Sequence, residues 1–167
     1  MIKVLFVCHG NICRSTMAQS VFAYLAKQNH LEDCFEIDSA ATSREEIGNS
    51  PHYGTVSKLR AEHIPLIPHR ARQMTREDYL YYDYLIGMDE ANIKNMRRIA
   101  GGGDSLDKIY KLLSFAEYEK NVRLQKAPDV ADPWYTGDFD ATYTDVTKGC
   151  KGLLAYLTKY EHHKYCQ

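Results

Sequence analysis

The amino-acid sequence predicts an α/β fold with a mostly parallel sheet. Short apolar segments alternate along the chain with segments whose apolar residues recur at spacings of three and four. The first pattern is typical of strands buried on both faces, and the second is typical of helices that cover a sheet. The chain has 167 residues, about the length of one domain, so we expect a single domain spanning residues 1–167.

Four strands are expected, each a short apolar run. The first run, Ile2 to Val7, leads through a loop into a helical pattern, as in a parallel β–α unit. The predicted strands cover residues 2–7, 35–39, 84–88 and 109–113. Ligands of such folds bind beyond the carboxyl ends of the strands, so the loop after residue 7 is the first place to look for a site.

The helices are expected where a capping residue precedes an amphipathic pattern. Ser50 is interpreted as an N-cap because Pro51 would occupy the first helical position, and Pro65 ends that helix. The predicted helices begin at Ser15, Ser50, Thr75, Asp89 and about Thr142. The fourth of these ends at the Gly101-Gly102-Gly103 run, and the last one continues to about Tyr160.

Charge, hydropathy and cysteine content exclude several classes of protein. Lys and Arg number 21 and Asp and Glu number 22, so the net charge of −1 predicts neither a nucleic-acid nor a membrane partner. The apolar runs are far shorter than the roughly 20 residues of a membrane-spanning helix. The five cysteines include no C-x-x-C pair, which argues against a zinc ribbon or a disulfide framework. We expect a reduced, cytoplasmic protein without a bound metal, with a tail that is disordered from about residue 161.

The loop after the first strand carries the strongest functional signal. Residues Cys8 to Arg14 read CHGNICR, and Ser15 stands at the expected helix start. Backbone N–H groups of such a loop converge on one point, and the helix dipole adds positive potential there. The Arg14 guanidinium binds two oxygens of a phosphate at once. Gly10 and Asn11 tolerate the left-handed backbone of a tight loop. The loop is therefore a candidate site for inorganic phosphate or another oxyanion.

The same environment makes Cys8 a candidate nucleophile. Positive potential favours the thiolate, and Ser15 is placed to donate a hydrogen bond to the sulfur. A thiolate at the floor of a phosphate site implies attack on phosphorus and a cysteinyl-phosphate intermediate. The alternative is that Cys8 is only a small apolar residue at the end of a strand.

A proton donor is also required, because the leaving group departs as an oxyanion. The best candidate is Asp132, in the run Asp132-Pro133-Trp134-Tyr135, which we expect to form a loop before the last helix. Pro133 stiffens the position, and Trp134 and Tyr135 are expected to wall the pocket and stack on an aromatic substrate. An ordinary Asp-Pro turn is the alternative, and Asp129 is a second candidate acid. The residues expected to contact phosphate or substrate are His9, Gly10, Asn11, Ile12, Cys13, Ser15, Trp134 and Tyr135.

Five motifs stand in a recognisable order over nearly the whole chain. They are VLFVCHGNICRSTMAQ near the N-terminus, DSA at 38–40, HRARQ at 69–73, DYLIGMDEAN at 83–92 and DPWYTG at 132–137. Together they resemble the low-molecular-weight protein-tyrosine phosphatase family. The resemblance implies a three-layer sandwich with a central four-stranded parallel sheet flanked by helices. It also implies a metal-independent hydrolase, without a cofactor, that acts on phosphotyrosine in protein substrates.

The resemblance also implies roles for individual residues. Cys8 corresponds to the nucleophile, Arg14 to the phosphate ligand, and Asp132 to the general acid that later acts as a base. Ser15 resembles the hydroxyl that stabilises the thiolate. Cys13 resembles the family's second cysteine, which can form a disulfide with the nucleophile, so redox regulation is expected.

A supporting set of residues follows from the same resemblance. Asn11, Ser39 and His69 resemble the residues whose hydrogen bonds hold the phosphate loop in its strained shape. Asp89 resembles the acid that fixes the arginine. The sequence departs from the family at the pocket rim, where residues 39–48 contain no aromatic residue and Glu45 and Glu46 stand instead.

Two further positions differ from the family pattern. Trp134 replaces the Tyr that is common after Asp-Pro, and His9 is the variable residue of the loop.

Three other functions use a similar loop or bind phosphate. An arsenate reductase uses the same loop but passes a disulfide along further thiols, and here there is no Cys between Cys34 and Cys150. A phosphate-binding module with a decayed site is disfavoured by the retained catalytic set. A carrier that transfers a phosphoryl group through a phosphocysteine would need neither Arg14 nor Asp132.

Overall fold

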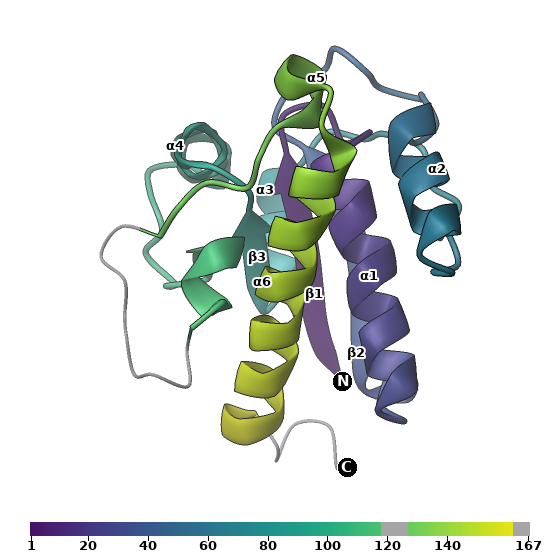
Figure 1. Ribbon diagram of the computed structural model, residues 1–167. Coiled ribbons are helices and arrows are strands. Elements are labelled where there is room, and N and C mark those ends of the chain that lie inside the picture. Colours follow the sequence, from purple (N-terminus) through teal and green to yellow (C-terminus); the bar gives the residue numbers. More distant parts are fainter. Residues whose placement is uncertain (118–126, 162–167) are drawn as a thin grey trace.

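The computed structural model describes residues 1–117 and 127–161 (Figure 1). Within these ranges, four strands form one sheet in the order β2-β1-β3-β4, and every neighbouring pair is parallel. The strands are β1 (Ile2–Cys8), β2 (Phe35–Ala41), β3 (Tyr84–Gly87) and β4 (Ile109–Lys111). The predicted α/β fold is confirmed, and β1 lies inside the sheet as its apolar sequence indicates.

Helices cover both faces of this sheet (Figure 1). One face carries α1 (Arg14–Gln28) and α6 (Phe139–Tyr160), with α2 (Tyr53–Ala61) beside α1. The other face carries α3 (Arg76–Tyr81) and α4 (Glu90–Ala100). The remaining elements are the 3₁₀ turns η1 (Glu32–Cys34) and η2 (Leu112–Phe115) and the short helix α5 (Pro133–Thr136). Layers of helix, sheet and helix result.

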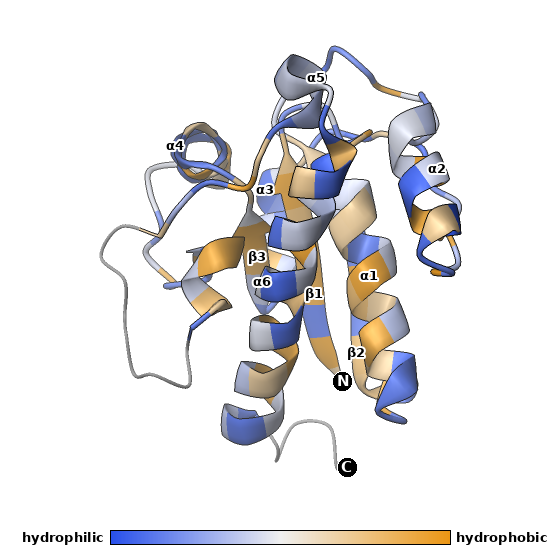
Figure 2. Cartoon of the chain, viewed as in Figure 1, coloured by the Kyte–Doolittle hydropathy of each residue, from blue (hydrophilic) through white to orange (hydrophobic). Residues whose placement is uncertain are grey.

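The side chains of β1 alternate between two hydrophobic clusters. Val4 and Phe6 pack in the cluster formed with α1 and α6, whereas Leu5 and Val7 pack in the cluster formed with α3 and α4. Successive side chains of a strand point to opposite faces, so a strand covered on both sides has to be apolar throughout. Figure 2 agrees with this, because the strands are coloured mostly as apolar, whereas the helices carry both polar and apolar residues.

Several predicted helix boundaries are correct because capping residues determine them. The side chains of Thr75 and Asp78 form a capping box at the start of α3. Asp89 and Asn92 form the same motif at the start of α4, and Gly101 ends that helix with φ at 95°. Gly is the usual residue at this left-handed position, because a Cβ adds strain there.

Other boundaries differ from the prediction. The helix α2 begins at Tyr53, because the ring of His52 accepts the capping hydrogen bond from the Gly54 amide. It ends at Ala61, before Pro65 is reached. The helix α6 begins at Phe139, earlier than predicted, because Asp138 caps it.

The outer strands differ as well. The strand β2 extends to Ala41, since that residue pairs with Cys8 at the end of β1. The strand β4 ends at Lys111, where η2 replaces the predicted extension. The disordered tail was predicted from about residue 161, and residues 162–167 lie outside the described residues. Among the described helices, none combines the length and the apolar composition needed to span a membrane.

Candidate active site

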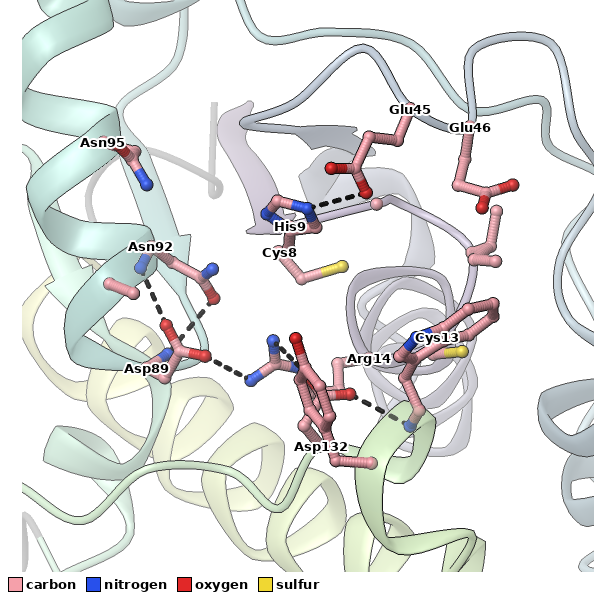
Figure 3. A pocket seen from close by; sticks show the side chains of 15 residues that line it. Cys8, His9, Cys13, Arg14, Glu45, Glu46, Asp89, Asn92, Asn95 and Asp132 are labelled. Atoms are coloured by element: carbon pink, nitrogen blue, oxygen red, sulfur yellow. Dashed lines mark hydrogen bonds and ion pairs between the residues drawn. The ribbon is translucent and has the colours of Figure 1, made fainter.

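A cavity of about 430 Å³ opens at the carboxyl end of the sheet, where residues of α5 contribute to its lining (Figure 3). Four segments that are distant in sequence line it. They contribute Cys8, His9, Gly10, Ile12, Cys13 and Arg14; Glu45 and Glu46; Asp89, Ala91, Asn92 and Asn95; and Asp132, Trp134 and Tyr135. The location agrees with the rule that ligands bind beyond the strand ends in this class of fold.

The loop between β1 and α1 is held by bonds to its outward-facing carbonyl groups. The carbonyl of His9 accepts from the Ser43 amide at 3.1 Å, and the carbonyl of Ile12 accepts from the His52 amide at 2.8 Å. In a trans peptide the C=O and the following N–H point in opposite directions. The amides of the residues that follow His9 and Ile12 therefore point toward the inside of the loop. The helix α1 adds its positive dipole end, and the result is an anion site.

Asn11 is the centre of the hydrogen-bond network behind this loop. Its Oδ1 accepts from the Arg72 amide at 3.2 Å and lies 2.7 Å from Nε2 of His69. Its Nδ2 donates to Oγ of Ser15 at 2.8 Å and to Oγ of Ser39 at 2.9 Å. Asn11 has φ of 59°, a left-handed conformation that is strained for a residue with a Cβ. Four bonds to a fully buried side chain keep it there.

A second set of contacts fixes the residues that hold Asn11. Ser39 donates to Oε1 of Gln19 at 2.6 Å. The guanidinium of Arg72 binds Asp38 at 3.1 Å and Asp78 at 2.9 Å, which links β2 to α3. Asp38 also lies 3.6 Å from Nδ1 of His69.

The surroundings of His69 disfavour the protonated form of its imidazole. Burial lowers the pKa of His69, the nearby Asp38 opposes this effect, and Arg72 adds to it. Since the amide oxygen of Asn11 only accepts, the Nε2 atom that faces it carries the proton.

The sulfur of Cys8 lies at the floor of the cavity. Its Sγ is 3.0 Å from Oγ of Ser15 and accepts from the Asn11 amide at 3.3 Å. Because the Ser15 hydroxyl already accepts from Asn11, its hydrogen is available to donate to a thiolate. Cys8 is 3% exposed, so the sulfur is accessible only through the cavity. One hydroxyl and one backbone amide therefore contact the sulfur directly.

Arg14 is the first residue of α1, and carboxylates flank its guanidinium (Figure 3). One terminal nitrogen donates to Asp89 at 2.8 Å, and the other lies 3.3 Å from Asp132. Burial disfavours the charge of Arg14, but the Cys8 sulfur and Asp89 outweigh it and raise the pKa of Arg14. Arg14 is therefore a permanent cation at the cavity floor.

Asp132 reaches the cavity from the N-cap of α5, where it accepts from the Trp134 amide at 3.1 Å. The predicted loop is thus a short helix, with Pro133 at its first position. Trp134 and Tyr135 are 61% and 85% exposed and line the cavity mouth. Asp129, the other candidate acid, instead binds Lys111 at 2.7 Å and lies outside this cavity.

Three predicted site residues occupy positions that differ from the expectation. Asn11 and Ser15 were expected to contact phosphate, but they are fully buried behind the loop and do not line the cavity. Gly10 and Asn11 were both expected to tolerate a left-handed backbone, and of the two only Asn11 has a positive φ. A Cβ at Gly10 would stand 3.3 Å from Cγ of Glu46, so its role is to allow close approach. Ser39 and His69 lie behind the loop, as the supporting role requires.

Cys13 is the N-cap residue of α1 and is 7% exposed. Burial, followed by the charge of Cys8, raises the pKa of Cys13 to about 12. Its carbonyl accepts from the hydroxyls of Thr16 and Thr55 at 3.1 Å and 3.2 Å. The thiol form of Cys13 therefore persists at neutral pH.

Sequence reasoning missed several residues of the site. Asn92 and Asn95 line the cavity from the first turns of α4. The Asp-x-x-Asn spacing of a capping box was a signal for Asn92, since such a side chain folds back toward the N-cap. Gln19 and the Arg72–Asp38 pair gave no separate signal, because their roles depend on contacts between distant segments.

Comparison with known proteins places the chain in a family. Residues 3–163 match the family described as Low molecular weight phosphotyrosine protein phosphatase. The low molecular weight protein-tyrosine-phosphatase YfkJ of Bacillus subtilis (strain 168) is 42% identical over 159 residues, 95% of this chain and 97% of the relative. The low molecular weight phosphotyrosine protein phosphatase of Homo sapiens is 36% identical over 154 residues, 91% of this chain and 93% of the relative.

Solved structures agree with the sequence comparison. The crystal structure of YfkJ superposes with a TM-score of 0.86 at 42% identity and covers 95% of this chain and 96% of its own. The crystal structure of SP-PTP from Streptococcus pyogenes gives a TM-score of 0.78 at 38% identity and covers 98% and 99%. The chain therefore belongs to the low molecular weight protein-tyrosine phosphatase family, as its motifs predicted.

Proposed function

We propose that this chain hydrolyses phosphotyrosine in proteins through a phosphocysteine at Cys8. One observation carries the proposal. The sulfur of Cys8, the guanidinium of Arg14 and the carboxylate of Asp132 line the same cavity at the start of α1. A nucleophile, an anion ligand and a proton donor around one space are the groups that phosphate monoester hydrolysis requires.

In the first step, the Cys8 thiolate attacks phosphorus and the P–O bond to the tyrosine ring breaks. Asp132 donates its proton to the departing phenolate, so that neutral tyrosine leaves. Arg14 and the inward-facing loop amides bind the phosphoryl oxygens while charge moves between the attacking and departing atoms. The Ser15 hydroxyl stabilises the thiolate before the attack, 3.0 Å from the sulfur.

In the second step, Asp132 accepts a proton from a water molecule, whose oxygen attacks the phosphocysteine. The P–S bond breaks, inorganic phosphate forms, and the Cys8 thiolate is regenerated. Arg14 supplies the positive charge in both steps, so the proposed mechanism involves no metal and no organic cofactor. One carboxylate can act first as acid and then as base, because it is left deprotonated once the phenol has departed.

The substrate class is supported by the mouth of the cavity. Trp134 and Tyr135 offer exposed aromatic surface beside the catalytic loop, on which the ring of a phosphotyrosine can stack. We further propose that the protein acts as a single domain in the cytoplasm on phosphotyrosine proteins.

Hydrolysis of p-nitrophenyl phosphate in the presence of EDTA tests the proposal. The wild type should be active, and Cys8→Ser should lose turnover while still binding phosphate or vanadate, because Arg14 and the loop amides remain. Cys34→Ser is the matched control, since Cys34 is half-buried at the opposite end of β2. Substantial activity in Cys8→Ser would contradict the proposed nucleophile.

The same preparation separates the alternative functions. Arsenate-dependent consumption of thiols without phosphatase activity would favour an arsenate reductase. Binding of phosphate without either activity would favour a phosphate-binding module. Phosphoserine peptides, measured beside phosphotyrosine peptides, test the stated substrate class, and equal rates would contradict it.

A further inference from the structure

Two glutamates form one side of the cavity mouth. Glu45 and Glu46 lie in the segment that follows β2, and Figure 3 shows them on the side away from Asp132. The side chain of Glu45 is 68% exposed, and Glu46 is half-buried. We call this pair the acidic rim. An acidic pair beside a site for a phosphate dianion is unfavourable for binding of the phosphate itself.

The acidic rim is built into the catalytic loop. A Cβ atom on residue 10 would lie 3.3 Å from Cγ of Glu46, so the side chain of Glu46 packs closely against the backbone of Gly10. Asn49 donates from Nδ2 to the Glu46 carboxylate at 2.6 Å and fixes its direction. The carboxylate of Glu45 lies 3.0 Å from Nε2 of His9, the variable residue of the loop. These contacts hold both carboxylates against the mouth.

Few fixed cations among the described residues lie close to the acidic rim. Among the described residues that line the cavity, Arg14 is the sole Lys or Arg, and it binds Asp89 and Asp132. Arg44 precedes the rim in sequence, but it donates to Oε1 of Gln73. Glu46 also lines the cavity, and its hydrogen-bond partner Asn49 is a neutral amide, which does not compensate the charge of a carboxylate.

We propose that the acidic rim determines substrate specificity by selecting phosphotyrosine flanked by Lys or Arg. The inference rests on the proposed function and extends it to the class of protein substrate. When a phosphotyrosine side chain occupies the cavity, the backbone of the substrate peptide lies at the mouth. The substrate residues next to the phosphotyrosine then lie beside the acidic rim. An ammonium or guanidinium there pairs with the carboxylates, whereas an acidic side chain is repelled by them.

The test compares three acetylated peptides, Gly-Ala-X-phosphotyrosine-X-Ala-Gly, in which both X residues are Lys, Gln or Glu. The measured quantity is kcat/KM from phosphate release. At low salt we expect the Lys peptide to exceed the Glu peptide about 3- to 10-fold, as for weakly screened surface pairs. The ratio should shrink between about 20 mM and about 500 mM NaCl, because the Debye length falls over that range.

The variant Glu45→Gln/Glu46→Gln should bring the Lys-to-Glu ratio close to one. Glu45→Gln alone, at the more exposed position, should lower the ratio in part and guards against a folding defect in the double variant. Glu32→Gln is the matched control, because it removes the same charge at η1, before the opposite end of β2. Its ratio should equal that of the wild type.

The possible results discriminate between the two proposals. A wild-type ratio near one, or a ratio that the rim variants leave unchanged, would overturn the specificity role. An equal loss for all three peptides would assign the glutamates a structural role instead. If p-nitrophenyl phosphate is hydrolysed and none of the three peptides is, the proposed function itself is wrong.

Discussion

The guanidinium of Arg14 lies 3.3 Å from the carboxylate of Asp132, so the proposed phosphate ligand and the proposed proton donor form an ion pair. The bond to Asp89 uses the other terminal nitrogen, at 2.8 Å. Asp89 is therefore able to hold Arg14 in place while phosphate competes with Asp132 for the remaining nitrogen. Binding of substrate should release the Asp132 carboxylate for proton transfer.

Replacing Asp132 by Asn should slow the hydrolysis of all substrates, and most of all of those whose leaving phenol is weakly acidic. General acid catalysis contributes about 10²- to 10⁴-fold, and less when the phenol is acidic. We expect kcat/KM for phenyl phosphate to fall far more than kcat/KM for p-nitrophenyl phosphate, because kcat/KM reports the first step, in which the phenol departs. Asp129→Asn is the control, because Asp129 lies outside the cavity, and an equal loss of kcat/KM for both substrates in Asp132→Asn would indicate a structural role.

Replacing Asp89 by Asn should separate two roles of that side chain. Asn is as good an N-cap as Asp, so α4 should keep its stability, whereas Ala should cost about 1 kcal/mol. Arg14 loses one of its two carboxylate partners in both variants, and we expect inhibition by inorganic phosphate to weaken about tenfold in each, or ~1.4 kcal/mol. Inhibition constants that match the wild type, with normal unfolding curves, would show that Asp89 does not position Arg14.

Stability should decline on acidification partly because of His69. Its pKa is lowered in the folded protein, so the folded state binds fewer protons than the unfolded chain. The contribution is complete above the unfolded pKa of about 6.5 and is lost as pH falls below it through the folded pKa. His69→Gln keeps a donor toward Asn11 and does not titrate.

Urea unfolding from pH 5 to pH 8 measures this effect. The difference in unfolding free energy between wild type and His69→Gln should shrink, or reverse, as pH falls below about 6.5. A difference that is constant over the whole range would mean that His69 does not contribute to the pH dependence.

Oxidation should produce a disulfide between the two loop cysteines. Peroxide converts the Cys8 thiolate to a sulfenic acid, and Cys13 then displaces water to form the S–S bond. The pKa of Cys13 near 12 means that it attacks slowly at neutral pH and faster as pH rises. Dithiothreitol should restore more activity after oxidation at pH 8.5 than at pH 6.5.

The variant Cys13→Ser should lose this protection and recover little activity, whereas Cys34→Ser should recover like the wild type. Peptide mapping identifies the cross-link directly. Equal recovery of wild type and Cys13→Ser, with no cross-linked peptide, would leave Cys8 a nucleophile without a resolving partner.

The features that could be predicted from the sequence are those determined by residues that are close together along the chain. The apolar run from Ile2 to Val7 indicated a strand covered on both faces, and the capping residues Thr75 and Asp89 indicated two helix starts. The order of strand, Cys8, loop, Arg14 and helix pointed to the anion site for the same reason, since each part adjoins the next along the chain.

What depends on contacts between distant segments was not predictable. The helix α2 is capped by His52, whose ring stacks on Phe139 of α6, and no local pattern encodes that pair. The ion pairs of Arg72 with Asp38 and Asp78 exist because residues 72–74 run beside the end of β2. Gly10 fits Glu46 closely only because the segment after β2 returns to the loop.

The hydrogen bond from the Ser43 amide to the His9 carbonyl has an evolutionary consequence. This bond connects the segment just before the acidic rim to the catalytic loop. An insertion or deletion before Ser43 would therefore displace the loop groups that bind phosphate. Exchange of the side chains at Glu45 and Glu46 leaves that attachment intact. Substrate preference should therefore change in evolution by substitutions at Glu45 and Glu46, while the length of the segment after β2 stays constant. Laboratory redesign of substrate preference should likewise substitute these two residues and keep that length.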